Sequence, residues 1–468
     1  MPRATFRFEE KLRNWKDGRT IEYATELIES AVLLGANEES REAAEYVLEN
    51  AKPWMIGAVT VAKRILGRPV SDYEELLRSR SENTVEESKS TIKLIRKTLK
   101  NEMQVPFLWV DLALAYENLG AQGKAERAMK IALSFASSNR FVVRAAARMF
   151  ERHGDIDYSH EVLRKSQLLL ADPWVLAADI AISSKVQRSS YYLKNAMRLL
   201  EDDQRFSPFH TAELASAVGS IELENGKQKK GRQLLRASLR QPTENTIAQA
   251  AWATRKYGVL IDLEGVSMAH PSAEGRALDD FAAGKWNEAL RYSHNWWLDQ
   301  PFSRRPAILG SYIALLVEDY KRAITISDNG LTPNPDSVML LNNESFALAR
   351  SGQLESAENV FAKIPRNQLS GDEEYVWYAT SGLLNFRKGN IVEGRKLYQK
   401  AIEYFANSQD LRKHGSAFLN YALEEIRVHP EKRSELLGRA KQFEAGPVDI
   451  RFTLKRLQDF NPAKPVHP

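Results

Sequence analysis

The segment FLWVDLALAYENLGAQGKAERAMKIAL, residues 107–133, decides the fold class of this chain. It contains two apolar stretches with helical periodicity, and a turn around Gly120 separates them. Glycine is typical of a helix end, because it adopts the left-handed conformation without a steric cost. Gly154 follows 34 residues later, which is the length that two short helices and two turns occupy. The segment therefore predicts one hairpin in a repeating series of helical hairpins.

The order of large, small and aromatic residues in this hairpin resembles the tetratricopeptide repeat family. The matching positions in the first copy are Trp109, Leu112, Ala113, Tyr116, Gly120, Ala125, Met129 and Ala132. Those in the second copy are Val143, Ala146, Ala147, Phe150, Gly154, Ser159, Leu163 and Ser166. Looser copies extend the resemblance over residues 106–406, with turn glycines at Gly226, Gly284, Gly352 and Gly389.

The resemblance implies an all-α fold, a right-handed superhelical solenoid of antiparallel helix hairpins. In such a stack the first helices of successive hairpins line a concave groove, where a ligand docks. Small residues at the matching positions let neighbouring helices approach to about 8 Å, the short end of normal helix packing. The unit over residues 173–200 departs from the pattern, because it is short and lacks the turn glycine.

Breaks in the rhythm divide the chain into parts. Residues 258–270 interrupt the repeats, and PVDIRFTLKRLQDF near the C-terminus predicts an amphipathic helix that covers the last hairpin. The predicted parts are an N-terminal helical region of degenerate repeats or a cap (1–104), a first repeat block (105–257), a seam or loop (258–270), a second block (271–408), C-terminal helices with the capping helix (409–460) and a flexible, proline-rich tail (461–468).

Composition limits the function classes. The 66 basic and 61 acidic residues give a net charge of +5, a mild excess that neither supports nor excludes a nucleic-acid partner. The absence of cysteine excludes disulfides, thiolate metal sites and cysteine nucleophiles. Residues 1–20 are rich in charge and do not resemble a signal peptide, and no apolar run is long enough to span a membrane. We expect a cytoplasmic protein, or a periplasmic one if a leader has been removed.

Arginine recurs at every fourth position along one predicted helix, at Arg140, Arg144, Arg148 and Arg152. We call these four residues the arginine ladder. Alignment to the repeat places Arg144, Arg148 and Arg152 on the groove side, where guanidinium groups bind carboxylate or phosphate in a bidentate manner. The alternative is a solvated face that is neutralised by acids of the preceding hairpin, such as Glu117 or Glu126.

A second basic run, GKQKKGRQLLRASLR, spans a predicted turn and second helix and has no acidic residue. It predicts a basic patch on the outer surface that contacts nucleic acid or anionic lipid. The alternative is solubilising charge, because no aromatic residue accompanies the run for base stacking. The patch consists of Lys227, Lys229, Lys230, Arg232, Arg236 and Arg240.

Aromatic residues gather at Trp286, Tyr292, Trp296 and Trp297. Tryptophan is a frequent hot spot at interfaces, but it also fills space between helices, and we favour core packing here. Two adjacent residues cannot share one helix face, so we expect at least one of Trp296 and Trp297 at the boundary of the core.

No catalytic constellation is present in the sequence. Asp155, Asp157, His160 and Glu161 resemble a ligand cluster, but acids at the start of a helix act as caps. Walker, HExxH and GxSxG motifs are absent. We expect a non-catalytic scaffold or adaptor without cofactor or metal, which binds a protein partner or acidic peptide segment in its groove. The alternative is a helical-repeat nucleic-acid-binding protein that uses the basic patches. The sequence does not indicate the oligomeric state.

Overall fold

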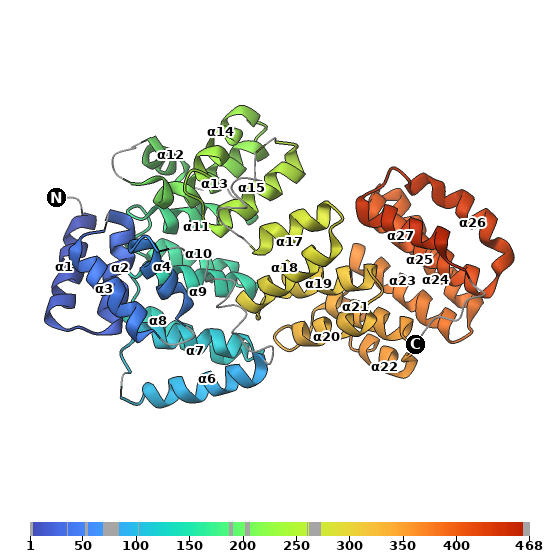
Figure 1. Cartoon of the computed structure of the whole chain (residues 1–468), viewed down its shortest axis with the longest axis horizontal. Helices are drawn as coiled ribbons and strands as arrows, with labels where there is room; N and C mark the ends of the chain where they lie inside the picture. Colours follow the sequence, from blue (N-terminus) through green and yellow to red (C-terminus); the bar gives the residue numbers. More distant parts are fainter. Residues whose placement is uncertain are drawn as a thin grey trace. The chain divides into compact units, whose positions relative to one another are not determined.

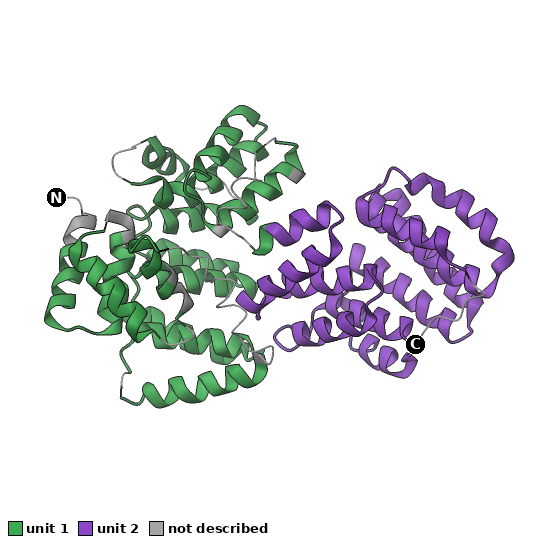
Figure 2. Ribbon diagram, in the orientation of Figure 1, with its two compact units in different colours: residues 1–275 green, residues 276–468 purple. Residues whose placement is uncertain are grey.

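The computed structural model describes residues 3–34, 36–51, 55–68, 84–101, 103–186, 191–201, 206–259, 261 and 273–461. All regular structure in these ranges is helical, with 25 α-helices and three short 3-10 helices (Figure 1). Most of the predicted seam and all but the first residue of the predicted tail lie outside the described residues. The chain divides into two compact units, Met1–Gly275 and Arg276–Pro468 (Figure 2).

Unit 1 contains an N-terminal group of helices followed by hairpins whose members are adjacent in sequence and packed together. Its helices are α1 (Arg3–Asp17), α2 (Ile21–Leu34), α3 (Glu38–Asn50), α4 (Ile56–Ile65), α6 (Thr84–Thr98), α7 (Pro106–Glu117), α8 (Gln122–Phe135), α9 (Arg140–Arg152), α10 (Ile156–Lys165), α11 (Pro173–Lys185), α12 (Leu193–Glu201), α13 (Pro208–Glu224), α14 (Gln228–Ser238) and α15 (Glu244–Tyr257).

Unit 2 continues the series of hairpins and ends with helix α27. Its helices are α17 (Ala273–Ala282, which begins at the end of unit 1), α18 (Trp286–Asp299), α19 (Arg304–Leu316), α20 (Tyr320–Leu331), α21 (Val338–Arg350), α22 (Leu354–Phe361), η1 (Arg366–Gln368), α23 (Asp372–Arg387), α24 (Ile391–Asn407), α25 (Leu411–Val428), η2 (Pro430–Lys432), α26 (Arg433–Ala440), η3 (Lys441–Phe443) and α27 (Val448–Asp459).

The predicted all-α class and its antiparallel hairpins are confirmed. The turn glycines explain why the hairpins that contain them reverse where they do. All six have φ between 65° and 86°, the left-handed conformation that ends a helix: Gly120, Gly154, Gly226, Gly284, Gly352 and Gly389. The predicted domain boundaries within the units stay predictions.

Small residues hold the two helices of a hairpin close together. In several hairpins a buried small residue of the first helix is followed, twelve positions later, by another in the second helix. Such pairs are Ala113 and Ala125, Ala147 and Ser159, Ser345 and Ala357, and Gly382 and Gly394. The Ser159 hydroxyl donates a hydrogen bond of 2.6 Å to the Ala147 carbonyl oxygen, which requires a close approach of α9 and α10. The close packing that the resemblance implies is therefore present.

The tryptophan pair differs from expectation. Trp296 and Trp297 are both buried, with 3% and 6% of their surface exposed, so the predicted boundary position is wrong. Helix α18 packs against α19, and Arg305 lies over the Trp296 ring at 5.0 Å from its centroid. A helix covered on more than one side buries adjacent residues together. Both tryptophan rings therefore pack in the core, which is the interpretation that we favoured for this cluster.

None of the helices in the described part of the chain combines the length and the apolar character that a membrane crossing requires.

Candidate functional site

The arginine ladder lies on helix α9, whose first turn is capped by the Asn139 side chain. The four-residue spacing places the ladder along one side of the helix. Its members nevertheless have different environments. Arg140 is buried, Arg144 is partly buried, and Arg148 and Arg152 are exposed.

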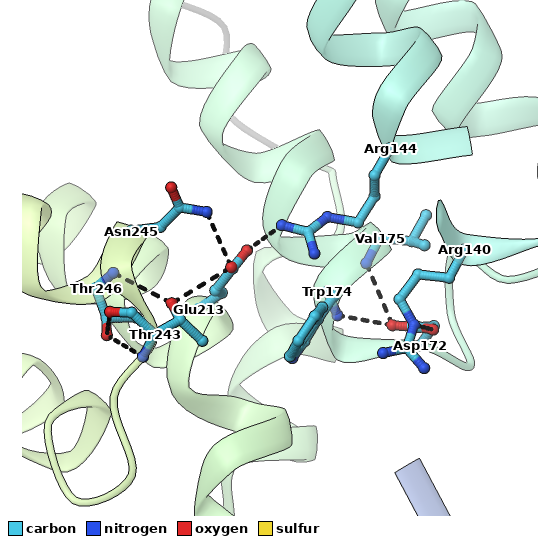
Figure 3. Close-up of polar contacts among 9 residues, drawn as sticks. All are labelled: Arg140, Arg144, Asp172, Trp174, Val175, Glu213, Thr243, Asn245 and Thr246. Carbon is cyan, nitrogen blue, oxygen red and sulfur yellow. Dashed lines mark hydrogen bonds and ion pairs between the residues drawn. The ribbon is translucent and has the colours of Figure 1, made fainter. Parts of the chain in front are cut away.

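Arg140 ties α9 to two other parts of unit 1. Its Nε donates a hydrogen bond of 2.8 Å to Asp172 (Figure 3). Its Nη2 donates one of 2.9 Å to the Glu29 carbonyl oxygen. Asp172 also caps α11 by accepting from the backbone N–H of Trp174. The charge of Arg140 and both of its hydrogen bonds are thus satisfied within unit 1. Arg140 therefore has a structural role in this unit.

Arg144 forms an ion pair with Glu213 of α13, and its guanidinium lies 4.9 Å from the centroid of the Trp174 ring (Figure 3). Glu213 also accepts hydrogen bonds from Asn245 at 3.0 Å and Thr243 at 3.4 Å. Burial raises the pKa of Glu213, but Arg144, Arg148 and these two hydrogen bonds outweigh it and leave the pKa below its usual value. Glu213 thus compensates much of the charge of Arg144. The buried Arg144 Nε still has no hydrogen-bond partner among the described residues, and burial lowers the pKa of Arg144 to about 10.

Arg152 and its neighbour His153 contact acids of the preceding hairpin. Arg152 Nη2 lies 3.0 Å from Glu117 Oε2, and the His153 ring nitrogens lie 2.7 Å from Glu117 and 3.0 Å from Glu126. These are the two glutamates that the sequence offers as the alternative to partner binding. Arg152 therefore stabilises the packing of successive hairpins.

Arg148 is the member of the ladder that remains available to a partner. Its side chain is exposed, and no ion pair joins it to another of the described residues. The ladder thus contains three arginines that bond acids of unit 1 and one, Arg148, without an ion pair to another described residue. The assignment of Arg144, Arg148 and Arg152 to partner binding stays a prediction. Among the three, Arg148 is the residue whose geometry favours it most.

His153 gives this cluster a pH dependence. Burial lowers the pKa of His153, but hydrogen bonds and charge from Glu117 and Glu126 outweigh it and leave the pKa above its usual value. A raised pKa in the folded state means that His153 stabilises the protein below its unfolded pKa and loses this contribution as pH rises through the folded value.

We expect His153→Gln to lower the free energy of unfolding by about 1 kcal/mol at pH 5.5, because hydrogen bonds to a charged group are lost. The loss should shrink steadily above pH 6.5. Urea unfolding of the variant and the wild type between pH 5.5 and 9 measures this. The control is His429→Gln, whose partner Glu431 lies in an exposed pair, and its effect should stay near zero. A constant loss at every pH would contradict the proposed protonation.

The basic patch lies on the α13–α14 turn, on α14 and, with Arg240, just after α14. Lys227 and Lys230 both pair with the buried Glu222, at 3.0 and 3.1 Å. Burial raises the pKa of Glu222, but the two lysines outweigh it and lower the pKa below its usual value. Arg232 is partly buried, and the exposed members of the patch are Lys227, Lys229, Lys230, Arg236 and Arg240.

A cavity of about 690 Å³ lies within unit 2, and the first helices of four successive hairpins line it. Side chains from α19, α21, α23 and α25 form its wall, with Tyr398 and Phe405 of α24 reaching it from the second layer. Helix α27 contributes Thr453, Arg456 and Leu457. The first helices thus present a common hollow, as the repeat resemblance implies for the groove. We call it the unit 2 cavity.

Helix α27 is bound to this face at both ends. Near its start, the fully buried Asp449 accepts a hydrogen bond of 2.8 Å from the Tyr312 hydroxyl and pairs with Arg412 at 3.0 Å. Near its end, Arg456 pairs with Glu318 and donates to the Leu316 carbonyl oxygen. The sequence predicts that this helix covers the last hairpin, and the structure shows that it also contacts α19.

An ion-pair network lies beside the unit 2 cavity. Arg350 and Arg387 both bond the buried Glu424, each at 2.8 Å, and Arg350 also lies 3.3 Å from Glu318. Arg350 and Glu424 are each 3% exposed in their side chains. These buried charges are mutually compensated, which fixes α21, α23 and α25 relative to one another.

Sequence reasoning missed Glu318, although a signal for it exists. Glu318 stands 34 residues after Gly284 and 34 before Gly352, at the turn position that glycine occupies in those hairpins. Its φ is 61°, a left-handed conformation that is costly for a residue with a side chain. The side chain bonds Arg350 and Arg456, which explains why a glutamate is held there. A break in the glycine period would have identified it.

Comparison with known proteins adds little to this description. No family model and no curated protein matches the sequence. The crystal structure of yeast Tom70 is similar with a TM-score of 0.33 and 12% identity, over 97% of this chain and 94% of that chain. The human IFIT1 dimer with PPP-AAAA gives a TM-score of 0.33 and 14% identity, over 91% of this chain and 95% of that chain. The fold described above rests on the helices and their packing alone.

Proposed function

We propose that this chain is a non-catalytic helical-repeat scaffold that binds a protein partner through the concave side of its hairpin stack. One observation carries the proposal. The face of unit 2 that the first helices line already holds a helix of the same chain, α27. A buried carboxylate at one end and an arginine at the other anchor this helix. The face therefore has the chemistry to bind an amphipathic helical segment.

The apolar contacts of α27 support the same proposal. Ile450, Leu454 and Leu457 are almost fully buried, at spacings of three and four residues that place them on one side of the helix. A partner helix with such a stripe, flanked by charges, would use the same kind of contacts in the groove.

The exposed basic residues favour a second candidate function. Lys229 and Arg236 are exposed on α14 and Arg240 is exposed just after it, and no ion pair involves them within the described part of the chain. A nucleic-acid complex formed through them would lose affinity steeply as salt rises from 50 to 200 mM. We place this candidate second, because the patch has no aromatic platform for bases.

Photo-cross-linking tests the proposal at single positions. We would introduce p-benzoylphenylalanine at Met339 in the unit 2 cavity, at Arg148, and at the exposed Val392 of α24 as the control. After irradiation in an extract of the host, we expect one defined protein adduct at Met339 or Arg148 and none at Val392. Adducts removed by nuclease would favour the second candidate. Equal labelling at all three positions, or no adduct, would contradict a partner in the groove.

A further inference from the structure

The unit 2 cavity contains polar atoms that the fold leaves without partners. Three buried atoms have no hydrogen-bond partner among the described residues: the Tyr398 hydroxyl, the side-chain amide oxygen Oδ1 of Asn342 and Nε of Arg427. All three residues line the same cavity. Tyr398 is 1% exposed and Asn342 is 7% exposed. Buried polar groups are normally paired, so three unpaired atoms at one cavity indicate a missing partner.

The electrostatic balance indicates the charge of that partner. Glu424 is the acid that acts on Arg427, and it already bonds Arg350 and Arg387. Burial, followed by repulsion from those two arginines, outweighs the attraction of Glu424 and lowers the pKa of Arg427. Arg427 is thus a guanidinium with too little negative charge around it. A carboxylate is the planar anion that guanidinium binds best.

The other cations on the cavity wall have their own acids. Arg412 pairs with Asp449, and Lys413 pairs with Asp372 and Asp410. An anion that entered the cavity would therefore compete with existing ion pairs at these positions but not at Arg427. The charge requirement is local to the Arg427 end of the cavity.

The remaining wall is suited to an apolar body. Leu315, Phe346, Phe405 and Leu423 line the cavity. The Phe460 ring lies beneath the Arg427 guanidinium, 5.3 Å from ring centroid to guanidinium carbon. The volume of about 690 Å³ lies inside the range of about 300 to 1,000 Å³ that is typical of small-molecule sites. An apolar cavity with a few polar groups is the usual form of such sites.

We propose that the unit 2 cavity binds a small organic carboxylate with an apolar body, whose carboxylate bonds Arg427 and the Tyr398 hydroxyl. The side-chain oxygen Oδ1 of Asn342 accepts a hydrogen bond from an N–H or O–H group of the same ligand. The site lies in the same unit 2 cavity that the cross-linking position Met339 lines, but calorimetric titration detects the ligand without any partner. Partner cross-linking can therefore fail while the ligand site holds, and the reverse.

A pair of isosteric probes tests the charge requirement. Naphthalene-1-acetate and naphthalene-1-acetamide have the same shape, and only the first is an anion. Calorimetric titration of the full chain should give a Kd at least tenfold lower for the acetate. Arg427→Gln should reduce this preference to less than threefold, because the guanidinium is lost. Lys413→Gln, the control at a paired cation of the same wall, should leave the preference intact.

Tyr398→Phe provides a second test that does not depend on how Arg427→Gln folds. The hydroxyl has no hydrogen-bond partner among the residues that the structure describes, so its removal should leave the unfolding midpoint unchanged or higher. It should nevertheless weaken acetate binding several-fold and change amide binding less. Equal affinities of the two probes for the wild type, no binding of either up to 1 mM, or acetate binding that neither variant changes would overturn the proposal.

Discussion

Replacing Glu424 with glutamine is expected to lower the free energy of unfolding of unit 2 by about 3 to 5 kcal/mol, the cost of removing one partner from a buried ion pair. Glu424 is 2% exposed and bonds both Arg350 and Arg387. The substitution keeps the side-chain volume and removes the charge. It therefore leaves Arg387 without an acid among the described residues and Arg350 with Glu318 alone, and Arg427 increases their repulsion.

Urea unfolding followed by circular dichroism, with hydrogen exchange of α21 and α25, would measure this loss in unit 2. The matched control is Glu358→Gln, which removes a surface partner of Lys388 in the same unit. Its expected effect is below about 1 kcal/mol, because solvent screens an exposed pair. If the two variants unfold at the same urea concentration, the network around Glu424 does not stabilise unit 2.

The fold of this chain is readable from its sequence because its determinants are local. A hairpin requires two apolar stripes, a glycine at the turn and small residues where its helices touch. Gly120, Ala113 and Ala125 satisfy these requirements within 13 residues of one another. The adjacent Trp296 and Trp297 show where this reasoning fails, because helical periodicity reports one buried face and α18 is covered on more than one.

The candidate sites are less readable, because their charges are compensated over long sequence distances. Arg144 finds Glu213 across 69 positions, and Arg350 finds Glu424 across 74. A four-residue spacing places arginines on one side of a helix, but it contains no information about which acids the fold brings to that side. Within the arginine ladder, Arg152 is the residue that pairs with an acid named from the sequence, Glu117. That pair could be expected because Glu117 lies in the adjacent hairpin.

One part of the unit 2 cavity can be predicted from the sequence, and another part cannot. The repeat pattern predicts a groove, but the position of α27 across it depends on single side chains such as Asp449 and Arg456. Neither residue belongs to a periodic pattern. The same holds for Arg427. That it has no ion-pair partner among the described residues becomes apparent only after Glu424 is assigned to Arg350 and Arg387. A site built from unpaired groups can therefore be identified only once the structure is known.

Gly394→Ala should destabilise unit 2 by about 1 to 3 kcal/mol, although alanine is the better helix former by about 1 kcal/mol. A Cβ atom at this position would lie 2.6 Å from the Phe386 ring and 3.1 Å from the Gly382 carbonyl oxygen. Neither neighbour has room to yield, since Phe386 is buried and Gly382 is backbone in the contact between α23 and α24. The helices must therefore separate.

Gly438→Ala is the control with the opposite sign. Gly438 lies in α26 with an exposed surface. Apart from its chain neighbours and the backbone of its own helix, no atom of the described residues would lie within 4 Å of an added Cβ. Its replacement should stabilise the protein by up to about 1 kcal/mol, because alanine loses less conformational entropy in a helix. Thermal and urea unfolding of the two variants should therefore move the midpoint of unit 2 in opposite directions. A shift of both toward higher stability would mean that α23 and α24 do not depend on the close contact of Gly382 with Gly394, and that helix propensity alone governs these positions.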